Sequence, residues 1–151
     1  MAIKAVVSSR ARDRIKELLR QITREQGGLY LAMLASSREL PDRWNFIISA
    51  PWSDSSGTRS VVSYLSSNLK HYVDKSTLSL IDRIVTFPKT ESFVERMLTV
   101  RPHSLEQPVR HITNWRAGDV WISEGYIFVV DPDAKTATIG RSIAHREMTA
   151  H

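Results

Sequence analysis

The chain has 151 residues, of which 42% are hydrophobic and 25% are charged, and this length and composition are typical of one globular domain. It has no cysteine, which excludes disulfide frameworks, thiolate zinc sites, iron–sulfur clusters and cysteine nucleophiles. No apolar run approaches the roughly 20 residues of a membrane span. We therefore expect residues 1–151 to form a single soluble, cytoplasmic domain that does not bind a membrane.

The formal net charge of +5 is concentrated near the N-terminus. Residues 1–38 hold eight basic and three acidic residues, whereas the rest of the chain is neutral in total. A local excess of positive charge favours a polyanionic partner, such as nucleic acid. The alternative interpretation is a solvated helix face that keeps the protein soluble.

The first predicted elements are a short strand over residues 2–7 and an amphipathic helix. Apolar residues recur at helical spacing over 11–22. The serines at 8–9 are candidate N-caps, and the glycines at 27–28 are expected to end the helix. Four cations repeat every four residues and therefore share one side of this helix, and they are the main candidate anion-binding residues: Arg12, Lys16, Arg20 and Arg24.

Two apolar runs, 29–36 and 43–52, are predicted to form a β-hairpin. Their near-continuous apolarity indicates burial on both faces, and hence helices packed on the sheet. A second amphipathic helix is predicted over 58–73, followed by a helical turn over 75–80 and a strand over 82–87.

A third helix is predicted over 90–100, where Ser92 and Glu95 have the spacing of a capping box and Thr90 is another candidate cap. Three further strands are predicted, at 108–115, 119–131 and 135–140. This order predicts an α/β or α+β fold, with a mixed β-sheet of five to six strands and about three packed helices.

The stretch SDSSGTR, residues 53–59, lies between a predicted strand and a predicted helix, where an anion can bind at the helix N-terminus. It lacks the Gly-Lys pair of a phosphate-binding P-loop. Its Asp, Ser and Thr side chains are suited to capping the helix, and this is the interpretation that we favour. The minority interpretation is a secondary anion site formed by Ser55, Ser56, Gly57, Thr58 and Arg59.

Known catalytic and metal-binding patterns are missing from the sequence. The five histidines do not occur at metal-ligand spacing. The nucleophile elbow G-x-S-x-G and the dinucleotide fingerprint G-x-G-x-x-G are also absent. We therefore predict no catalytic residue, no metal site and no cofactor.

Aromatic residues alternate with cations in the stretch VRHITNWRAGDVW, residues 109–121. This pattern is compatible with a surface on which nucleic-acid bases stack. Large aromatic residues are more often buried, however, and we favour the interpretation that they belong to the core of the sheet.

The predicted function is a small basic binding or accessory module. If it has a polar partner, we expect nucleic acid or another polyanion that binds through the first helix. If all four cations met phosphates of duplex DNA, log K would fall against log[salt] with a slope of about −3.6, since each contact contributes ~0.9. One alternative is a small enzyme that acts on a phosphorylated or nucleotide substrate at the 53–59 loop. Another is a homo-oligomeric assembly subunit, which would expose a large apolar patch.

Overall fold

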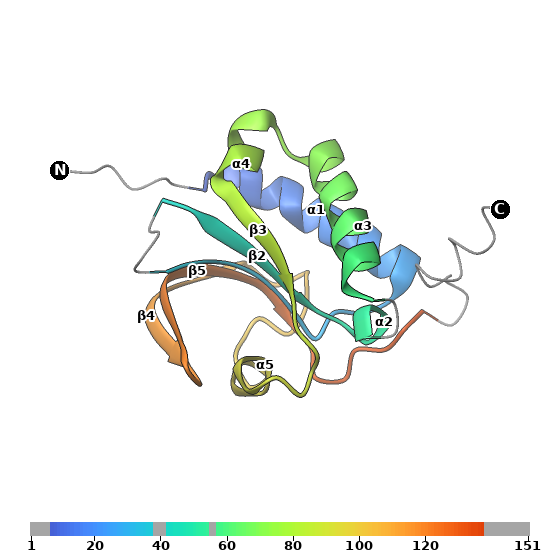
Figure 1. Ribbon diagram of the computed structural model, residues 1–151, viewed down its shortest axis with the longest axis vertical. Helices are drawn as coiled ribbons and strands as arrows, with labels where there is room; N and C mark the ends of the chain where they lie inside the picture. Colours follow the sequence, from blue (N-terminus) through green and yellow to red (C-terminus); the bar gives the residue numbers. More distant parts are fainter. Residues whose placement is uncertain (1–6, 38–41, 55–56, 138–151) are drawn as a thin grey trace.

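A computed structural model of the chain describes residues 7–37, 42–54 and 57–137. These residues form five strands and five helices (Figure 1). In chain order they are α1 (Ser9–Gln26), β1 (Leu31–Ser36), β2 (Trp44–Ser49), α2 (Pro51–Asp54), α3 (Thr58–Tyr72), α4 (Lys75–Leu80), β3 (Ile81–Thr86), α5 (Ser92–Met97), β4 (Arg110–Ala117) and β5 (Val120–Val130).

All five strands belong to one mixed sheet with the spatial order β3-β2-β1-β5-β4. The central strand β1 pairs antiparallel with both β2 and β5, and β4 pairs antiparallel with β5. The edge strand β3 runs parallel to β2, and the connection that parallel pairing requires is supplied by α3 and α4. The predicted mixed sheet is confirmed, with an α+β arrangement and two more helices than the three expected.

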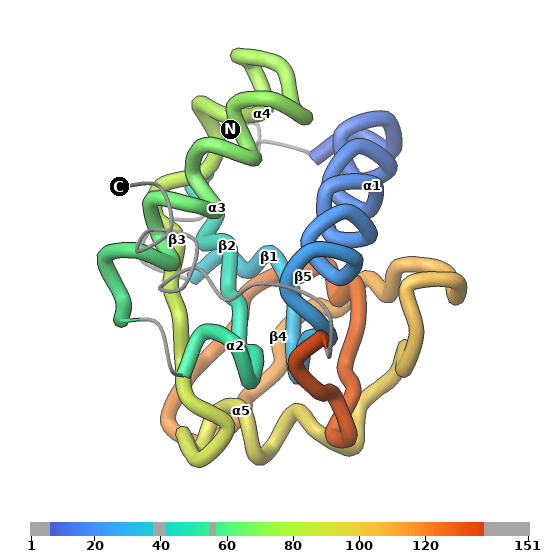
Figure 2. Tube along the Cα trace, turned by 90° about the vertical axis from the view of Figure 1, so that its right-hand side faces the viewer, coloured from blue at the N-terminus to red at the C-terminus, as the bar shows by residue number. Residues whose placement is uncertain are grey.

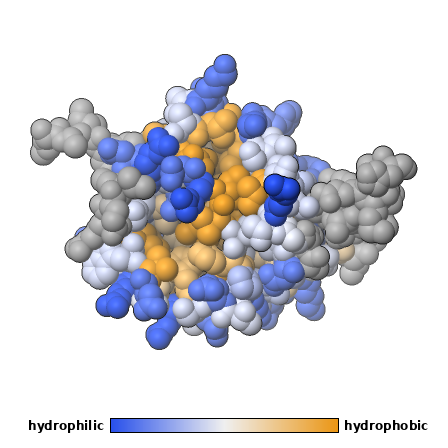
Figure 3. Space-filling view, viewed as in Figure 1, coloured by the Kyte–Doolittle hydropathy of each residue, from blue (hydrophilic) through white to orange (hydrophobic). Residues whose placement is uncertain are grey.

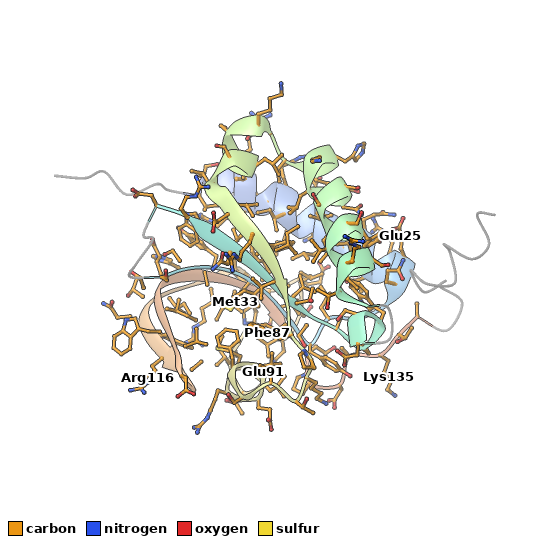
Figure 4. All side chains as sticks on the ribbon, viewed as in Figure 1. Glu25, Met33, Phe87, Glu91, Arg116 and Lys135 are labelled. Atoms are coloured by element: carbon orange, nitrogen blue, oxygen red, sulfur yellow. The ribbon has the colours of Figure 1, made fainter. Side chains whose placement is uncertain are left out.

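Helices cover both faces of the sheet, as Figure 1 shows: α1, α3 and α4 lie on one face and α5 lies on the other. The first core, between the sheet and α1 and α3, contains the fully buried Trp44 and Phe46. The second core lies between the sheet and α5, and the side chains of Met33 and Phe87 point toward this helix (Figure 4). All six residues of β1 are buried, which confirms the predicted burial on both faces.

The first helix begins and ends where the sequence predicts. Ser8 Oγ accepts a hydrogen bond of 3.1 Å from the backbone N–H of Ala11. Gly27 ends the helix with φ 119°, a left-handed conformation that side-chain-bearing residues rarely adopt. A Cβ atom at this position would lie 2.5 Å from the carbonyl oxygen of Lys135, so only glycine fits here.

The predicted strand over 43–52 is too long. β2 ends at Ser49, and Pro51–Asp54 form the short helix α2 instead. The physical reason is Pro51, whose fixed φ suits the first turn of a helix and which has no N–H to donate to a sheet.

The capping box predicted for the third helix is also wrong. α5 is only six residues long, Ser92–Met97, and its N-cap is Glu91. Ser92 is therefore the first helical residue and does not occupy the capping position. Hydrophobic spacing located this helix, but the predicted range of 90–100 begins two residues before α5 and ends three residues after it.

Two of the predicted strands fall at the limits of the described residues. Of the strand predicted over 2–7, only the last residue is described. Of the strand predicted over 135–140, the described part makes a single β-bridge, between Thr136 and Gly27, and residues 138–140 lie outside the described residues.

Apolar side chains gather on the surface over β3, between α3 and α4 (Figure 3). The residues of α4 and β3 that pack only partly against the first core are Leu78, Leu80, Ile81 and Ile84. Among the described residues, no helix is both long enough and apolar enough to cross a lipid bilayer.

The second predicted helix is confirmed as α3, which turns Val61, Leu65 and Leu69 into the first core. We expect Leu65→Asp to unfold the protein or to lower the free energy of unfolding by several kcal/mol, because it buries an unpaired charge. Ser63→Asp adds the same charge at an exposed position of the same helix. Denaturant unfolding of both variants is the measurement, and equal stability of the two would contradict this packing.

Candidate functional site

The cation-bearing side of α1 faces the chain segment 103–109, which leads into β4; Figure 2 shows this part of the chain passing beside the helix. The Nζ atom of Lys16 donates a hydrogen bond of 2.8 Å to the carbonyl oxygen of Gln107. The Nε atom of Arg20 lies 3.5 Å from a carboxylate oxygen of Glu106. The middle of the predicted stripe therefore already contacts acceptors of its own chain.

The two ends of the stripe differ in exposure. Arg12 donates a 2.8 Å hydrogen bond to the carbonyl oxygen of Val7, and its guanidinium lies 4.7 Å from the ring centroid of Tyr126. Arg24 is exposed, and its guanidinium donates to the side-chain oxygen of Gln21 at 2.7 Å, within the helix. The most exposed cation of the stripe is thus at the C-terminal end of α1.

The C-terminal half of the stripe lines a groove of about 520 Å³ between α1, the segment after α5 and the end of β5, which we call the α1 groove. This volume lies within the range of sites that hold small ligands. Its lining residues are Arg20, Thr23, Arg24, Gly28, Leu29, His103, Ser104, Leu105, Glu106, Val129 and Asp131.

His103 and Ser104 bring polar groups to the wall opposite α1. The Nδ1 atom of His103 lies 3.0 Å from the carbonyl oxygen of Val130. Because a carbonyl oxygen only accepts, Nδ1 carries the proton, and Nε2 is the second polar atom of the ring. Ser104 Oγ accepts a 3.1 Å hydrogen bond from the backbone N–H of Glu106, so the hydroxyl proton can be donated to another acceptor.

Positive and negative charges are balanced in the α1 groove, since Arg20 and Arg24 share it with Glu106 and Asp131. The side chain of Glu106 is 80% exposed, so its contact with Arg20 contributes about 1 kcal/mol or less. Asp131 accepts a 3.0 Å hydrogen bond from the backbone N–H of Asp133 and stabilises the turn after β5. An incoming anion therefore competes with a weakly held carboxylate for Arg20.

The 53–59 loop is described only in part. Ser55 and Ser56 lie outside the described residues, so their predicted role in anion binding stays a prediction. Gly57 is the N-cap of α3, with φ 71°, and Thr58 and Arg59 are the first two residues of the helix. Thr58 therefore does not occupy the N-cap position, contrary to the capping interpretation of that residue.

A smaller hollow, of about 180 Å³, lies beside the start of α3. It is lined by Asp54 and Thr58 together with residues 86–88 after β3, and Arg59 is not part of its wall. Partial burial raises the pKa of the Asp54 carboxyl above its usual value. The hollow thus holds a perturbed carboxyl group, but it does not bring Asp54 and Arg59 together.

We expect Asp54→Asn to keep or raise stability at neutral pH, because burial disfavours the charged carboxylate and the amide carries no charge. A raised folded-state pKa destabilises the fold above that pKa, and the penalty vanishes below the unfolded-state pKa of about 3.9. Denaturant unfolding at neutral pH and below this value measures the difference. Asp42→Asn, at an exposed position, is the matched control. If the free energy of unfolding of Asp54→Asn at neutral pH is lower than that of Asp42→Asn, the expectation is contradicted.

The four tryptophans have different environments. Trp44 and Trp52 are fully buried in the first core, and Trp115 is half-buried against the second. Trp121, at the turn end of the β4–β5 hairpin, is 40% exposed. The interpretation that the aromatics belong to the core is correct for the first two, whereas Trp121 is exposed, as the alternative of a stacking surface requires.

Within the described ranges, no three His, Asp or Glu side chains gather in a way that would hold a metal ion. Comparisons of the chain with protein-family models, with curated proteins and with solved structures found no match. A functional proposal for this chain therefore rests on the side chains that line the α1 groove and on their geometry.

Proposed function

We propose that the protein is a binding module that holds phosphate groups of a polyanion in the α1 groove. The observation that carries this proposal is that Arg20 and Arg24 line the same groove as His103 and Ser104. The planar guanidinium of arginine matches the geometry of phosphate oxygens and can donate two parallel hydrogen bonds. The hydroxyl of Ser104 is a further donor for the same kind of ligand.

An extended polyanion fits this site better than a single small anion does. The carboxylates of Glu106 and Asp131 offset the two arginines, so an isolated anion gains little net attraction in the groove. A long anion can also pass Lys16 and Arg12, which continue the same side of α1 over roughly 18 Å at ~1.5 Å per residue. The repeated phosphates of nucleic acid have this character.

We expect the variant Arg20→Glu/Arg24→Glu to abolish low-salt binding of duplex DNA and of polyphosphate. Lys16 and Arg12 already bond to carbonyl oxygens, so they attract a long anion by their charge, while only Arg20 and Arg24 contact phosphates directly. The slope of log K against log[salt] for duplex DNA is then about −1.8, instead of the −3.6 of four contacts. Fluorescence anisotropy titrations over a series of salt concentrations measure both quantities.

The matched control for this charge reversal is Lys70→Glu/Arg83→Glu. It changes the net charge by the same amount at two exposed positions, on α3 and β3, neither of which lines the α1 groove. Circular dichroism checks that both variants stay folded. If the two variants lose binding equally, or if binding survives in the Arg20/Arg24 variant, the α1 groove is not the site.

We also expect Glu106→Gln to strengthen polyanion binding by roughly 2- to 5-fold. The substitution removes the carboxylate that competes for Arg20, and exposed pairs of this kind contribute only ~0.2–1 kcal/mol. Glu95→Gln, an exposed acid on α5, is the control for net charge. An affinity unchanged relative to the control would mean that Glu106 does not compete with the ligand.

Two other functions each have one supporting observation. The hollow beside Asp54, with its raised carboxyl pKa, supports an enzyme that uses this carboxyl group as a proton donor. The apolar surface over the edge strand β3 (Figure 3) supports a homo-oligomeric assembly subunit. Neither the hollow beside Asp54 nor the apolar surface over β3 brings together as many ligand-binding side chains as the α1 groove does.

A further inference from the structure

The turn end of the β4–β5 hairpin carries an exposed apolar surface. Val120 and Trp121 are 38% and 40% exposed, and they are the only large apolar side chains among the described residues that are exposed to this degree. Aromatic rings exposed to solvent are the surfaces on which nucleic-acid bases stack, and Trp121 is such a ring.

Cations accompany the aromatic rings of this hairpin. Arg116 is the cross-strand partner of Trp121, and Figure 4 shows it at the outer end of the hairpin. Its Nε atom donates to the carbonyl oxygen of Gly118 at 3.3 Å. The guanidinium of Arg110 lies 4.9 Å from the ring centroid of Trp115. Each tryptophan of the hairpin therefore has an arginine beside it, as in surfaces that bind single strands.

The backbone of β4 is poorly suited to adding a strand from another protein chain. Asn114 has φ 53°, a left-handed conformation that interrupts the regular extended backbone. As a consequence, Ile112 and Ala117 both face the second core, although a regular strand would place residues five apart on opposite faces. A bent edge of this kind discourages strand pairing, so side chains rather than backbone groups carry recognition here.

Tyr126 of β5 is buried in the first core, and side chains of both the hairpin and α1 pack on its ring. The ring of His111 stacks on Tyr126 with a centroid distance of 4.8 Å, and the guanidinium of Arg12 lies over the same ring. The carboxylate of Glu124 is bonded to His111 at 2.6 Å. Asp119, in the turn, is the other acidic group of the hairpin. His111 of the hairpin and Arg12 of α1 thus contact the same ring, which places the start of the stripe beside the β4–β5 hairpin.

We propose that the β4–β5 hairpin binds the bases of single-stranded nucleic acid by stacking on Trp121, while the phosphates run along α1 toward the α1 groove. This inference rests on the proposed function and names its partner as single-stranded. A duplex keeps its bases stacked on one another, so Trp121 adds little to duplex binding.

The test measures the binding of Trp121→Ala and of wild type to three probes. The first is a single-stranded oligonucleotide of about 16 nucleotides, made as DNA and as RNA. The second is the matching duplex, and the third is polyphosphate. Single-strand affinity is expected to fall roughly 5- to 150-fold on loss of the stacking ring. Affinity for the duplex and for polyphosphate is expected to change less than twofold, and the DNA and RNA arms show which sugar is preferred.

Two further variants test whether the aromatic ring itself is responsible for the loss of affinity. Trp121→Phe retains an aromatic face and is expected to recover most of the single-strand affinity, whereas Val120→Ala, at the neighbouring exposed position, is expected to leave it unchanged. An unchanged single-strand affinity in Trp121→Ala, or equal losses on all probes, overturns the inference. A change from oligomer to monomer in sedimentation of Trp121→Ala overturns it in favour of a self-association surface.

The polyphosphate arm separates this inference from the proposed function. If wild type binds polyphosphate through Arg20 and Arg24 but its single-strand affinity does not depend on Trp121, the α1 groove stands and the hairpin inference fails. If polyphosphate, duplex and single strands all fail to bind at low salt, both proposals fail together.

Discussion

The pairing of β5 with the central strand β1 is the interaction on which the rest of the structure depends. β1 is buried along its whole length, so each of its faces needs a covering layer and each of its edges a neighbour. β2 supplies one neighbour from the adjacent sequence, and β5 supplies the other from near the end of the described chain. The return of β5 also brings residues 103–109 beside α1, and this creates the α1 groove.

Residue spacing alone was sufficient to locate the two long helices. In α1 and α3 the apolar residues recur once per turn, and that pattern depends only on neighbours in sequence. Short elements were less predictable, because a few polar residues decide their ends. Pro51 begins a helix where apolar residues alone predicted a continued strand. Glu91 occupies the N-cap position of α5 without a side-chain capping hydrogen bond, although Ser92 has the preferred chemistry for that position.

The candidate site was only half predictable for a similar reason. The four-residue repeat correctly indicates that Arg20 and Arg24 share one side of α1, but no local pattern indicates which residues face that side. Glu106 and His103 come from a part of the chain that is distant in sequence, and only the fold brings them to the groove. The positive charge of α1 could therefore be predicted from the sequence. The acidic and carbonyl groups that offset this charge could not, because they come from a distant part of the chain.

The wide sequence separation of β1 and β5 also has a consequence for the order of folding. Their register joins Leu31 to Val130, and α1 precedes both. Contacts between distant residues form late, since a long loop must close before they contribute any stability. During synthesis α1 therefore emerges with its cations unopposed, well before Glu106 and the wall of the groove exist. Until the last strand is in place, the helix carries its cations without the wall that forms the α1 groove.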